Sequence, residues 1–475
     1  MFGGGTRLPV NRGFIQDLVT TITSRSRELV GFDRIGRRAG EPDLPALARD
    51  ILGVKGEASG VALALELLDG YARADASQRL SFLKVLATDF GPDTARLQVA
   101  VAAYLADSGA EAAAALNDAS EPRRQELLRR LNRAPGGTEA LVRMREDLLL
   151  ALREHKDLAV VDRDFVHLLA SWFNRGFLVL KRIDWTTAAN ILEKIIRYEA
   201  VHTIQNWDDL RNRLAPGDRR CFAFFHPQMG DEPLVFVEVA LTREIPGAIA
   251  PLLDLDRAAI PAARATTAVF YSISNCQAGL KGISFGNFLI KQVVEELKRE
   301  LPGLTTFVTL SPVPGFMGWL GRMLKADDAD RPALDWQELA TLQDPGWSTR
   351  AMPGDRNLLQ EAELAAAAWY FLEAKAGSKP LDPVARFHLG NGARLERINW
   401  RGDVSANGLR QAGGLMVNYL YELGAIEANH EAFVQHGTIA ASQAVRKLNA
   451  APSAASVRRR SRPAAAAAPS AADKG

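Results

Sequence analysis

The sequence has few of the features that mark secreted or membrane proteins. Its 475 residues include only two cysteines, Cys221 and Cys276. Two cysteines in so long a chain predict reduced thiols in a cytosol-like compartment rather than a disulfide framework. The chain also lacks any run of about 18 uncharged apolar residues, so no membrane-spanning helix is expected. We therefore expect a cytoplasmic protein. The segment 15–30, rich in Arg, Ser and Thr, leaves the mitochondrial matrix as the alternative.

An excess of one charge is absent too. Lys and Arg total 58 against 56 acidic residues, a formal net charge of +2. This balance argues against a dedicated nucleic-acid-binding protein, which must neutralise phosphates. The seven histidines are scattered without the close pairing of metal ligands, so no metal site is predicted. The chain is 47% hydrophobic, which is enough for a large core divided between two or three domains.

The first part of the chain, residues 10–175, predicts helices throughout. In the segment 138–155, for example, Leu141, Met144 and Leu148 recur at spacings of three and four residues. That spacing is typical of the apolar face of an amphipathic helix. Because no cluster of reactive side chains accompanies these helices, we interpret the region as a packing or oligomerisation domain.

Segments rich in β-forming residues follow. The runs 221–227 and 234–242 predict two strands joined by a turn. Further strands are expected at 265–274 and 304–310, with a helix between them. Because a strand–helix–strand unit is a crossover connection, those two strands should be parallel and neighbouring or nearly so. The segment 449–475, rich in Ala, Pro and Ser around a run of Arg, predicts a disordered tail.

The first turn of this crossover carries Gly279, Gly282 and Gly286. Such a turn presents backbone N–H groups at the positive end of a helix, where anions bind, and glycines let a ligand approach closely. The spacing matches neither a Walker A loop nor Gly-x-Gly-x-x-Gly, so a purely structural turn is the alternative. A third interpretation is the nucleophile elbow of α/β-hydrolases, because Ser284 lies in Gly-x-Ser-x-Gly and His388 follows downstream. The helical first part of the chain disfavours the elbow, since that fold needs several parallel strands before the nucleophile.

Two further side chains are candidates for chemistry. Ser311 follows the second strand of the crossover, at the edge of an open sheet where ligands bind, and Pro312 stiffens the backbone beyond it. The alternative is that Ser311 only opens a turn. His388 stands next to Leu-Gly-Asn-Gly. This context predicts a loop or strand end rather than an apolar helix face, which favours a functional histidine.

Several of these residues belong to a set of ordered motifs that resembles the malonyl-CoA decarboxylase family. The resemblance covers roughly residues 10–448. It implies an α+β multidomain protein, with an N-terminal all-α helical bundle at 10–175 and a GCN5-related acyltransferase-like (GNAT) α/β catalytic domain at 176–448. It also implies a homotetramer assembled through the helical domain. The motifs are those at 271–291, 309–316, 387–393, 397–400 and 416–421.

The resemblance implies site residues as well. The paired catalytic serine and histidine of the family correspond to Ser311 and His388, with further pocket positions at Ser272 and Tyr421. The CoA-contacting loop corresponds to Lys281, Gly282, Ile283, Ser284, Phe285, Gly286 and Asn287.

The chemistry of the implied reaction is consistent with these residues. Malonyl-CoA that loses CO2 becomes an enolate delocalised onto the thioester oxygen, so the substrate is its own electron sink and we expect no metal or organic cofactor. Ser311 is predicted to orient the departing carboxylate; the alternatives are that it bonds to His388 instead, and that the serine itself takes part in the proton transfer. His388, as a group with a pKa near neutrality, is predicted to protonate the carbon and so yield acetyl-CoA, a step of fatty acid metabolism. An acyl-CoA N-acyltransferase of the same fold and a non-catalytic CoA-sensing scaffold are the alternatives.

Overall fold

The structure is a computed structural model that describes residues 43–283, 285, 289–327, 329, 331–344, 346–348 and 356–449. The chain divides into two compact units. The first comprises Met1–Ala200, Phe222–Phe236 and Ser274–Gly286, and the second comprises Val201–Cys221, Val237–Ile273 and Asn287–Gly475. The tail predicted for 449–475 lies outside the described residues, apart from its first residue.

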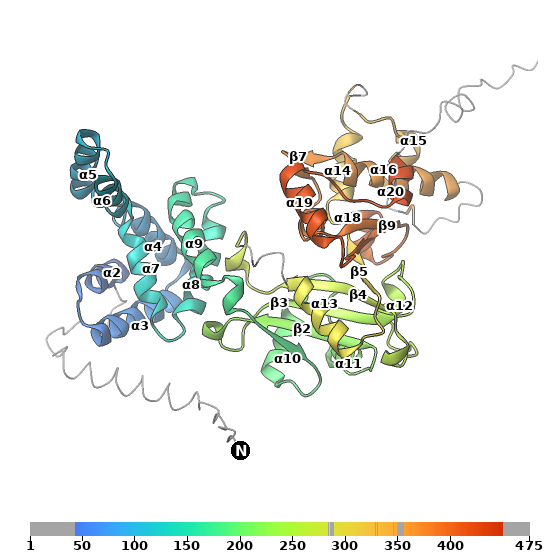
Figure 1. Cartoon of the computed structure of the whole chain (residues 1–475), viewed down its shortest axis with the longest axis horizontal. Coiled ribbons are helices and arrows are strands. Elements are labelled where there is room, and N and C mark those ends of the chain that lie inside the picture. The colour runs from blue at the N-terminus through green and yellow to red at the C-terminus, as the bar shows by residue number, and fades with distance from the viewer. Residues whose placement is uncertain are drawn as a thin grey trace, which may run out of the picture. The chain divides into compact units, whose positions relative to one another are not determined.

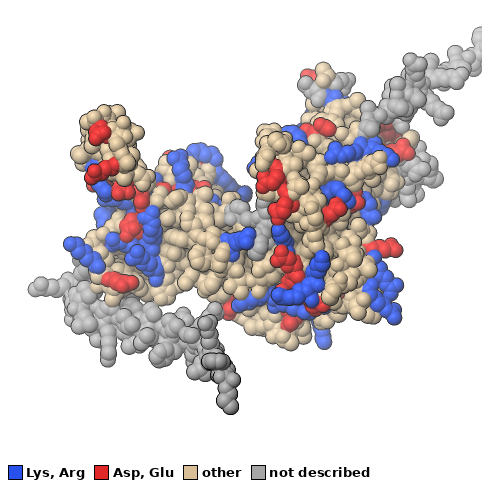
Figure 2. Space-filling view, viewed as in Figure 1, with Lys and Arg blue, Asp and Glu red and all other residues tan. Residues whose placement is uncertain are grey.

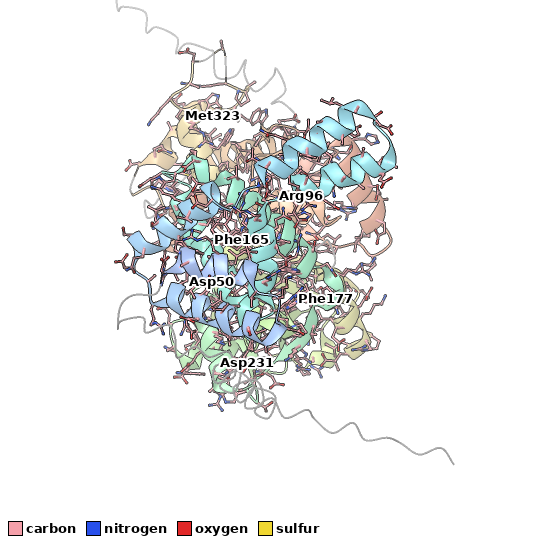
Figure 3. All side chains as sticks on the ribbon, turned by 90° about the vertical axis from the view of Figure 1, so that its left-hand side faces the viewer. Asp50, Arg96, Phe165, Phe177, Asp231 and Met323 are labelled. Carbon is pink, nitrogen blue, oxygen red and sulfur yellow. The ribbon has the colours of Figure 1, made fainter. Side chains whose placement is uncertain are left out.

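The described residues of the first unit begin with a series of helices (Figure 1). Most of these helices bury an apolar face in a common core, in which Leu141, Met144 and Leu148 are buried as the helical spacing predicts. Phe165 belongs to the same core, whereas Arg96 is exposed (Figure 3). The prediction of a helical N-terminal region is therefore confirmed for these residues. The helices are α2 (Leu44–Gly53), α3 (Glu57–Arg73), α4 (Ala76–Thr88), α5 (Thr94–Ala106), α6 (Ala110–Ser120), α7 (Arg123–Asn132), α8 (Gly137–Ala151) and α9 (Ala159–Trp172).

The described residues also form an eight-stranded mixed sheet, in the order β1-β2-β3-β4-β5-β10-β6, with β9 paired to β10. β2 and β3 are almost entirely buried, so most of their residues are apolar and no alternation of apolar and polar residues is seen. The strands are β1 (Val179–Ile183), β2 (Arg219–Phe225), β3 (Pro233–Thr242), β4 (Thr267–Asn275), β5 (Thr306–Thr309), β6 (Ser311–Pro312), β9 (Arg394–Asn399) and β10 (Met416–Leu420); β7 (Lys375–Ala376) pairs separately with β8 (Lys379–Pro380).

The predicted crossover is present. β4 and β5 are parallel and adjacent, in a register that runs from Thr267 opposite Thr306 to Phe270 opposite Thr309. The connecting helix α13 (Leu289–Glu300) buries its apolar face, as expected of a crossover helix. β4 continues to Asn275 after β5 has ended, so the two strands stop pairing at the carboxyl end of β5. The fold class is thus confirmed as α+β, with a helical region followed by a domain built on a mixed sheet.

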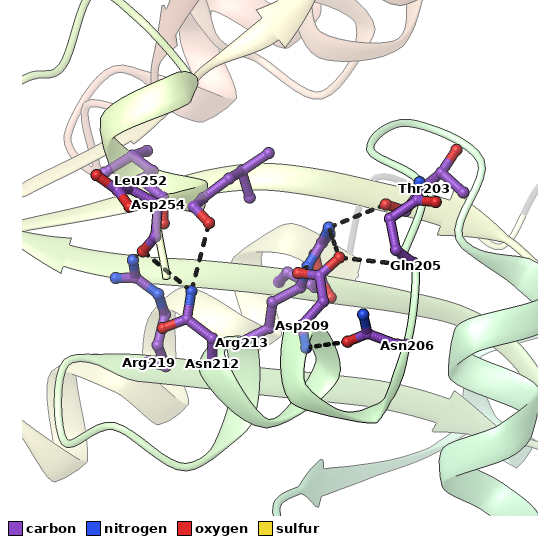
Figure 4. Close-up of polar contacts among 11 residues, drawn as sticks. Thr203, Gln205, Asn206, Asp209, Asn212, Arg213, Arg219, Leu252 and Asp254 are labelled. Atoms are coloured by element: carbon purple, nitrogen blue, oxygen red, sulfur yellow. Dashed lines mark hydrogen bonds and ion pairs between the residues drawn. The ribbon is translucent and has the colours of Figure 1, made fainter. Parts of the chain in front are cut away.

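Further helices flank the sheet, and all of them except α10 belong to the second unit. One of them, α11 (Trp207–Leu214), is held by hydrogen bonds of the buried Arg213. This side chain donates to Asp209 on its own helix and to Glu238 on β3, each at 3.1 Å, and its contacts to Asp209 and Thr203 are drawn in Figure 4. Removal of one partner from such a buried pair leaves an uncompensated charge, so the pair fixes how α11 packs on β3. The helices are α10 (Ala189–Tyr198), α11 (Trp207–Leu214), α12 (Ala250–Leu253), α14 (Phe316–Met323), α15 (Trp336–Ala340), α16 (Arg356–Leu372), α17 (Pro383–Gly390), α18 (Ala406–Ala412), α19 (Ile426–His436) and α20 (Gln443–Asn449).

A buried carboxyl group on α16 should make stability depend on pH. Glu363 is fully buried and accepts a hydrogen bond from Trp400 Nε1 at 2.8 Å. Burial raises the pKa of Glu363 from about 4.5 to about 8. The native state therefore holds this proton more tightly than the unfolded chain, and we expect the free energy of unfolding to fall between about pH 5 and about pH 8. The Glu363→Gln variant, which mimics the protonated form, should lose this part of the slope.

Denaturant titrations at several pH values test this expectation. Glu361→Gln, an exposed position on the same helix, controls for the general effect of removing a carboxylate from α16. An unchanged slope in Glu363→Gln would show that the carboxyl group does not titrate with the raised pKa.

Candidate functional site

The structure brings Ser311 and His388 together, although 77 residues separate them in the sequence. Ser311 Oγ lies 3.2 Å from His388 Nε2 and 2.9 Å from Thr309 Oγ1. Both side chains are buried, with 5% and 3% of their surface exposed. A hydroxyl and an imidazole in hydrogen-bond contact, shielded from bulk water, form an arrangement that can bind an anionic group and move a proton.

Strand pairing explains where Ser311 lies. β5 ends at Thr309, and the chain resumes as β6 at Ser311, so the serine is part of a short strand rather than of a turn. β10 runs antiparallel to both segments, with Val417 opposite Ser311 and Leu420 opposite Val308. The alternative interpretation of Ser311 as a residue that only opens a turn is therefore wrong.

β10 also supplies the aromatic surroundings of His388. The imidazole stacks on the ring of Tyr419, with ring centroids 4.6 Å apart and planes inclined by 23°. Tyr421, two residues later, places its hydroxyl 2.8 Å from His388 Nδ1. Because alternate residues of an extended chain point to the same side, these two tyrosines reach one imidazole. Both ring nitrogens of His388 thus have a hydroxyl partner.

The prediction that His388 lies on a loop or strand end is wrong, because it lies on the helix α17. Asp382 caps this helix by accepting a hydrogen bond from Ala385 N at 2.8 Å, and Pro383 occupies the first turn, where its missing N–H costs nothing. The glycines that follow His388 end the helix: α17 stops at Gly390, and Gly392 has a φ of +79°. The glycine-rich context therefore marked a helix end one turn beyond the histidine.

The expectation of a near-neutral pKa for His388 is also wrong. Complete burial lowers the pKa of His388 to about 3. The cause is desolvation, which penalises the charged imidazolium. His388 is consequently a neutral imidazole at neutral pH, and its two nitrogens differ: one carries a hydrogen and the other accepts one.

Two residues that the sequence did not single out support this pair. Thr309 Oγ1, which contacts Ser311, also accepts a hydrogen bond from the backbone N–H of Tyr419 at 3.1 Å. Asn418 is fully buried and donates to Thr309 O at 2.8 Å. The β9–β10 register shifts between Asn418 and Tyr419, so a β-bulge or a similar irregularity of the ladder lies beside the pair. Thr309 could have been found from the sequence, because residues two apart in an extended segment point to the same side and Thr309 is two residues before Ser311.

The glycine loop belongs to the first unit, and the structure describes it in part. Gly279 is part of the short 3-10 helix η6 (Ala278–Leu280), and Gly282 follows with a φ of +81°. Of the predicted contact residues, Lys281 is exposed, Ile283 is buried and Phe285 is intermediate. Ser284, Gly286 and Asn287 lie outside the described residues. The nucleophile-elbow interpretation, which concerns Ser284, therefore stays a hypothesis.

The remaining predicted pocket residue, Ser272, lies on β4. It is two residues beyond Phe270, the last residue of β4 that pairs with β5, and its side chain is buried. The structure thus shows where Ser272 lies without testing its predicted role.

The glycine loop has partners in the helical region that sequence reasoning missed. Arg145 on α8 donates from Nη1 to the carbonyl oxygens of Gly279 and Lys281, at 2.6 and 2.9 Å. Glu146, the next residue, accepts from the N–H of Gly279 at 3.3 Å. No sequence signal could have indicated contacts across more than 130 residues.

Two family models match the sequence. One, described as the malonyl-CoA decarboxylase N-terminal domain, matches residues 90–173. The other, described as the malonyl-CoA decarboxylase C-terminal domain, matches residues 176–460 and so more than half of the chain. The chain belongs to the malonyl-CoA decarboxylase family.

Curated relatives and solved structures agree. The mitochondrial malonyl-CoA decarboxylase of the goose Anser anser anser is 36% identical over 404 residues, which is 78% of this chain and 79% of that protein. The malonyl-CoA decarboxylase of Rhodopseudomonas palustris is 62% identical, with a TM-score of 0.83 over 86% of this chain and all of that one. That of Agrobacterium vitis is 57% identical, with a TM-score of 0.81 over the same shares. The resemblance noted from the motifs is therefore confirmed.

Membership in the malonyl-CoA decarboxylase family leaves the division of this chain into domains at 10–175 and 176–448 as a prediction. No helix in the described part of the chain combines the length and the apolar character that a membrane span requires. Cys221 and Cys276 are both buried and unbridged. Burial also raises the pKa of Cys276, which keeps this thiol protonated.

Proposed function

We propose that the protein is a carboxy-lyase that converts malonyl-CoA to acetyl-CoA and CO2. The observation that carries the proposal is the buried contact between Ser311 and His388 in a chain of this family. The curated goose and rat relatives are named malonyl-CoA decarboxylases. The pair provides the two functions that the reaction requires of the protein, a donor for the carboxylate and a proton for the carbon.

In the proposed reaction, the bond between the carboxylate carbon and the methylene carbon breaks. Its electron pair forms an enolate whose charge lies largely on the thioester oxygen, and CO2 leaves. Ser311 binds the carboxylate and so holds the breaking bond in position, and His388 then supplies the proton that converts the methylene carbon to the methyl group of acetyl-CoA. This transfer leaves His388 as an imidazolate, which regains its hydrogen from solvent, so the net reaction consumes one solvent proton for each CO2 released. The thioester itself accepts the electron pair, so we propose that no metal or organic cofactor takes part.

The hydroxyl groups around His388 support one proton arrangement. We propose that the Tyr421 hydroxyl donates to Nδ1, 2.8 Å away, so that the hydrogen of the neutral ring is on Nε2, on the side of Ser311 Oγ. In the structure, the Ser311 hydroxyl donates to Thr309 Oγ1 at 2.9 Å. We propose that this hydroxyl turns to the carboxylate when malonyl-CoA binds. Since the pKa of Tyr421 is raised well above its usual value by burial, this hydroxyl keeps its hydrogen. In this arrangement Nε2 is the proton donor.

We also propose that the glycine loop contacts CoA through Lys281, Gly282, Ile283 and Phe285, together with Ser284, Gly286 and Asn287. Backbone N–H groups of a glycine-bearing turn are suited to phosphate oxygens, and the exposed Lys281 adds a positive charge. Ser272 and Tyr421 complete the proposed set of substrate contacts.

Turnover of malonyl-CoA alone tests the proposed activity. Purified protein should release CO2 and form acetyl-CoA in equal amounts without an added amine. An N-acyltransferase would instead require an amine acceptor and would form an amide, and a CoA-sensing scaffold would bind the thioester without consuming it. Either of those results would contradict the proposal.

Further proposals concern location and partners. The two unbridged cysteines are suited to a reducing compartment, and we propose the cytoplasm. We propose no nucleic-acid partner, because basic and acidic side chains are interspersed on the face that Figure 2 shows.

We propose that the protein assembles as a homotetramer through its helical region. The hairpin of α5 and α6 supports this, because Leu105 and Val99 on α5 are 80% and 71% exposed. Large apolar side chains exposed on one hairpin are candidates for protein contacts, and in a homo-oligomer the partner is a second copy of the chain.

The Val99→Glu/Leu105→Glu double variant should therefore sediment as a smaller species than the parent protein, because charges placed in an apolar interface must be desolvated. Analytical ultracentrifugation measures this. Val434→Glu, at another exposed valine, is the matched control. A parent protein that is already monomeric, or a double variant of parental size, would contradict the proposal.

A further inference from the structure

The helical region contains a buried arginine whose hydrogen bonds go to the glycine loop. Arg145 on α8 is only 2% exposed. Its Nε donates to Asp162 Oδ1 on α9 at 2.8 Å, which fixes the plane of the guanidinium group. Nη1 then reaches the carbonyl oxygens of Gly279 and Lys281. A buried guanidinium group with directed hydrogen bonds to a carboxylate and to two carbonyl oxygens holds the loop backbone in a fixed position.

The loop is also fitted closely to α8. A Cβ atom at Gly279 would lie 1.9 Å from the carbonyl oxygen of Val142, so only glycine permits this approach. On the same helix, α8, Glu146 Oε1 accepts a hydrogen bond from the backbone N–H of Gly279 at 3.3 Å. Carbonyl and N–H groups of the loop are thus both held by α8.

The bonds from Arg145 also set the direction of an N–H group on the other side of the loop. The peptide between Lys281 and Gly282 is trans, so its N–H points away from its C=O. Because Arg145 holds the C=O of Lys281 toward α8, the N–H of Gly282 is directed to the side opposite α8. An N–H that is fixed in direction before binding is a better anion donor than one that must be ordered during binding.

We propose that Arg145 is a positioning residue for substrate binding: it holds the glycine loop so that the Gly282 N–H binds a phosphate of the CoA nucleotide. The helical region then contributes to affinity for CoA thioesters, beyond its role in packing or assembly. This inference rests on the proposed contact between the loop and CoA. The residue acts through the loop and has no part in the chemical step.

Two substrates separate this role from a general structural one. Malonyl-CoA carries the nucleotide phosphates, whereas malonyl-pantetheine has the same reactive group without them. Arg145→Gln should raise the KM for malonyl-CoA by about tenfold, with kcat nearly unchanged, because loop ordering must then occur during binding. The KM for malonyl-pantetheine should stay within about twofold of the parent value. Gly279→Ala, which forces the loop away from Val142, should show the same split.

Arg130→Gln is the matched control. Arg130 on α7 also donates to backbone carbonyl groups, those of Ile51 and Val54 at 2.6 and 3.0 Å, but these lie at the end of α2. Its loss should lower the midpoint of thermal unfolding and leave both KM values unchanged. If Arg145→Gln does not fold, Arg145→Lys, which retains one charged donor, replaces it in the same comparison.

The outcomes are distinguishable. An equal rise of both KM values, or no change in either, would overturn the role of Arg145 while the parent protein still turned over malonyl-CoA. A parent protein inactive on both substrates would contradict the proposed function and, with it, this inference.

Discussion

Replacing His388 by asparagine should lower the kcat for malonyl-CoA decarboxylation by about 10²–10⁴-fold, the range expected for loss of a positioned proton donor. The KM should change far less, because the variant keeps a polar side chain on α17 and the rest of the site. Ser311→Ala should cause a comparable loss, since without the hydroxyl the carboxylate lacks its donor. The measurement is the steady-state rate of CO2 release at saturating substrate.

His430 provides the matched control for this result. It lies on α19 and its Nδ1 is 2.7 Å from the carbonyl oxygen of Gly390, so it contacts the end of α17 without touching the pair. His430→Asn should keep kcat within about threefold of the parent value. If His388→Asn were as active as His430→Asn, His388 would have no place in the mechanism.

Tyr421→Phe should lower kcat by about a hundredfold with little change in KM. The variant keeps the ring and removes only the hydroxyl that contacts His388 Nδ1. Without that donor the neutral imidazole is free to carry its hydrogen on Nδ1, which leaves Nε2 unable to deliver a proton; loss of the correct tautomer is costly in other imidazole-dependent enzymes. Nitrogen NMR of the imidazole should show a smaller fraction of the Nε2–H form.

Tyr419→Phe is the companion variant, because Tyr419 contacts His388 through its ring. It should retain the stacking, the Nε2–H form and activity within about threefold of the parent. A Tyr421→Phe protein with parental kcat, or an unchanged tautomer ratio, would show that Tyr421 does not set the proton arrangement.

The parts of the fold that follow from local periodicity were predictable. The spacing of Leu141, Met144 and Leu148 predicts α8, and the order of β4, α13 and β5 predicts the parallel pair, because both signals lie within short stretches of sequence. Local periodicity gives no information on the pairing of β10, which lies between β5 and β6 in the sheet although more than 100 residues separate it from them in the sequence. The sheet beyond β5 was therefore not predicted.

The candidate site shows the same limit. The family motifs include Ser311, His388 and Tyr421, but they do not show that the Tyr421 hydroxyl contacts Nδ1, the imidazole nitrogen that faces away from Ser311. The helical position of His388 was missed because the glycines after it were interpreted as a loop rather than as a helix end. Its low pKa was missed because burial is a property of the folded chain.

The proposed roles of Ser311 and His388 can be checked in a crystal structure of the full chain with a malonyl-CoA analogue in which a sulfonate replaces the carboxylate. We expect a sulfonate oxygen at hydrogen-bond distance from Ser311 Oγ, about 2.6–3.2 Å, with the adjacent methylene carbon facing His388 Nε2. A sulfonate bound elsewhere, with Ser311 and His388 in contact only with each other, would contradict these roles.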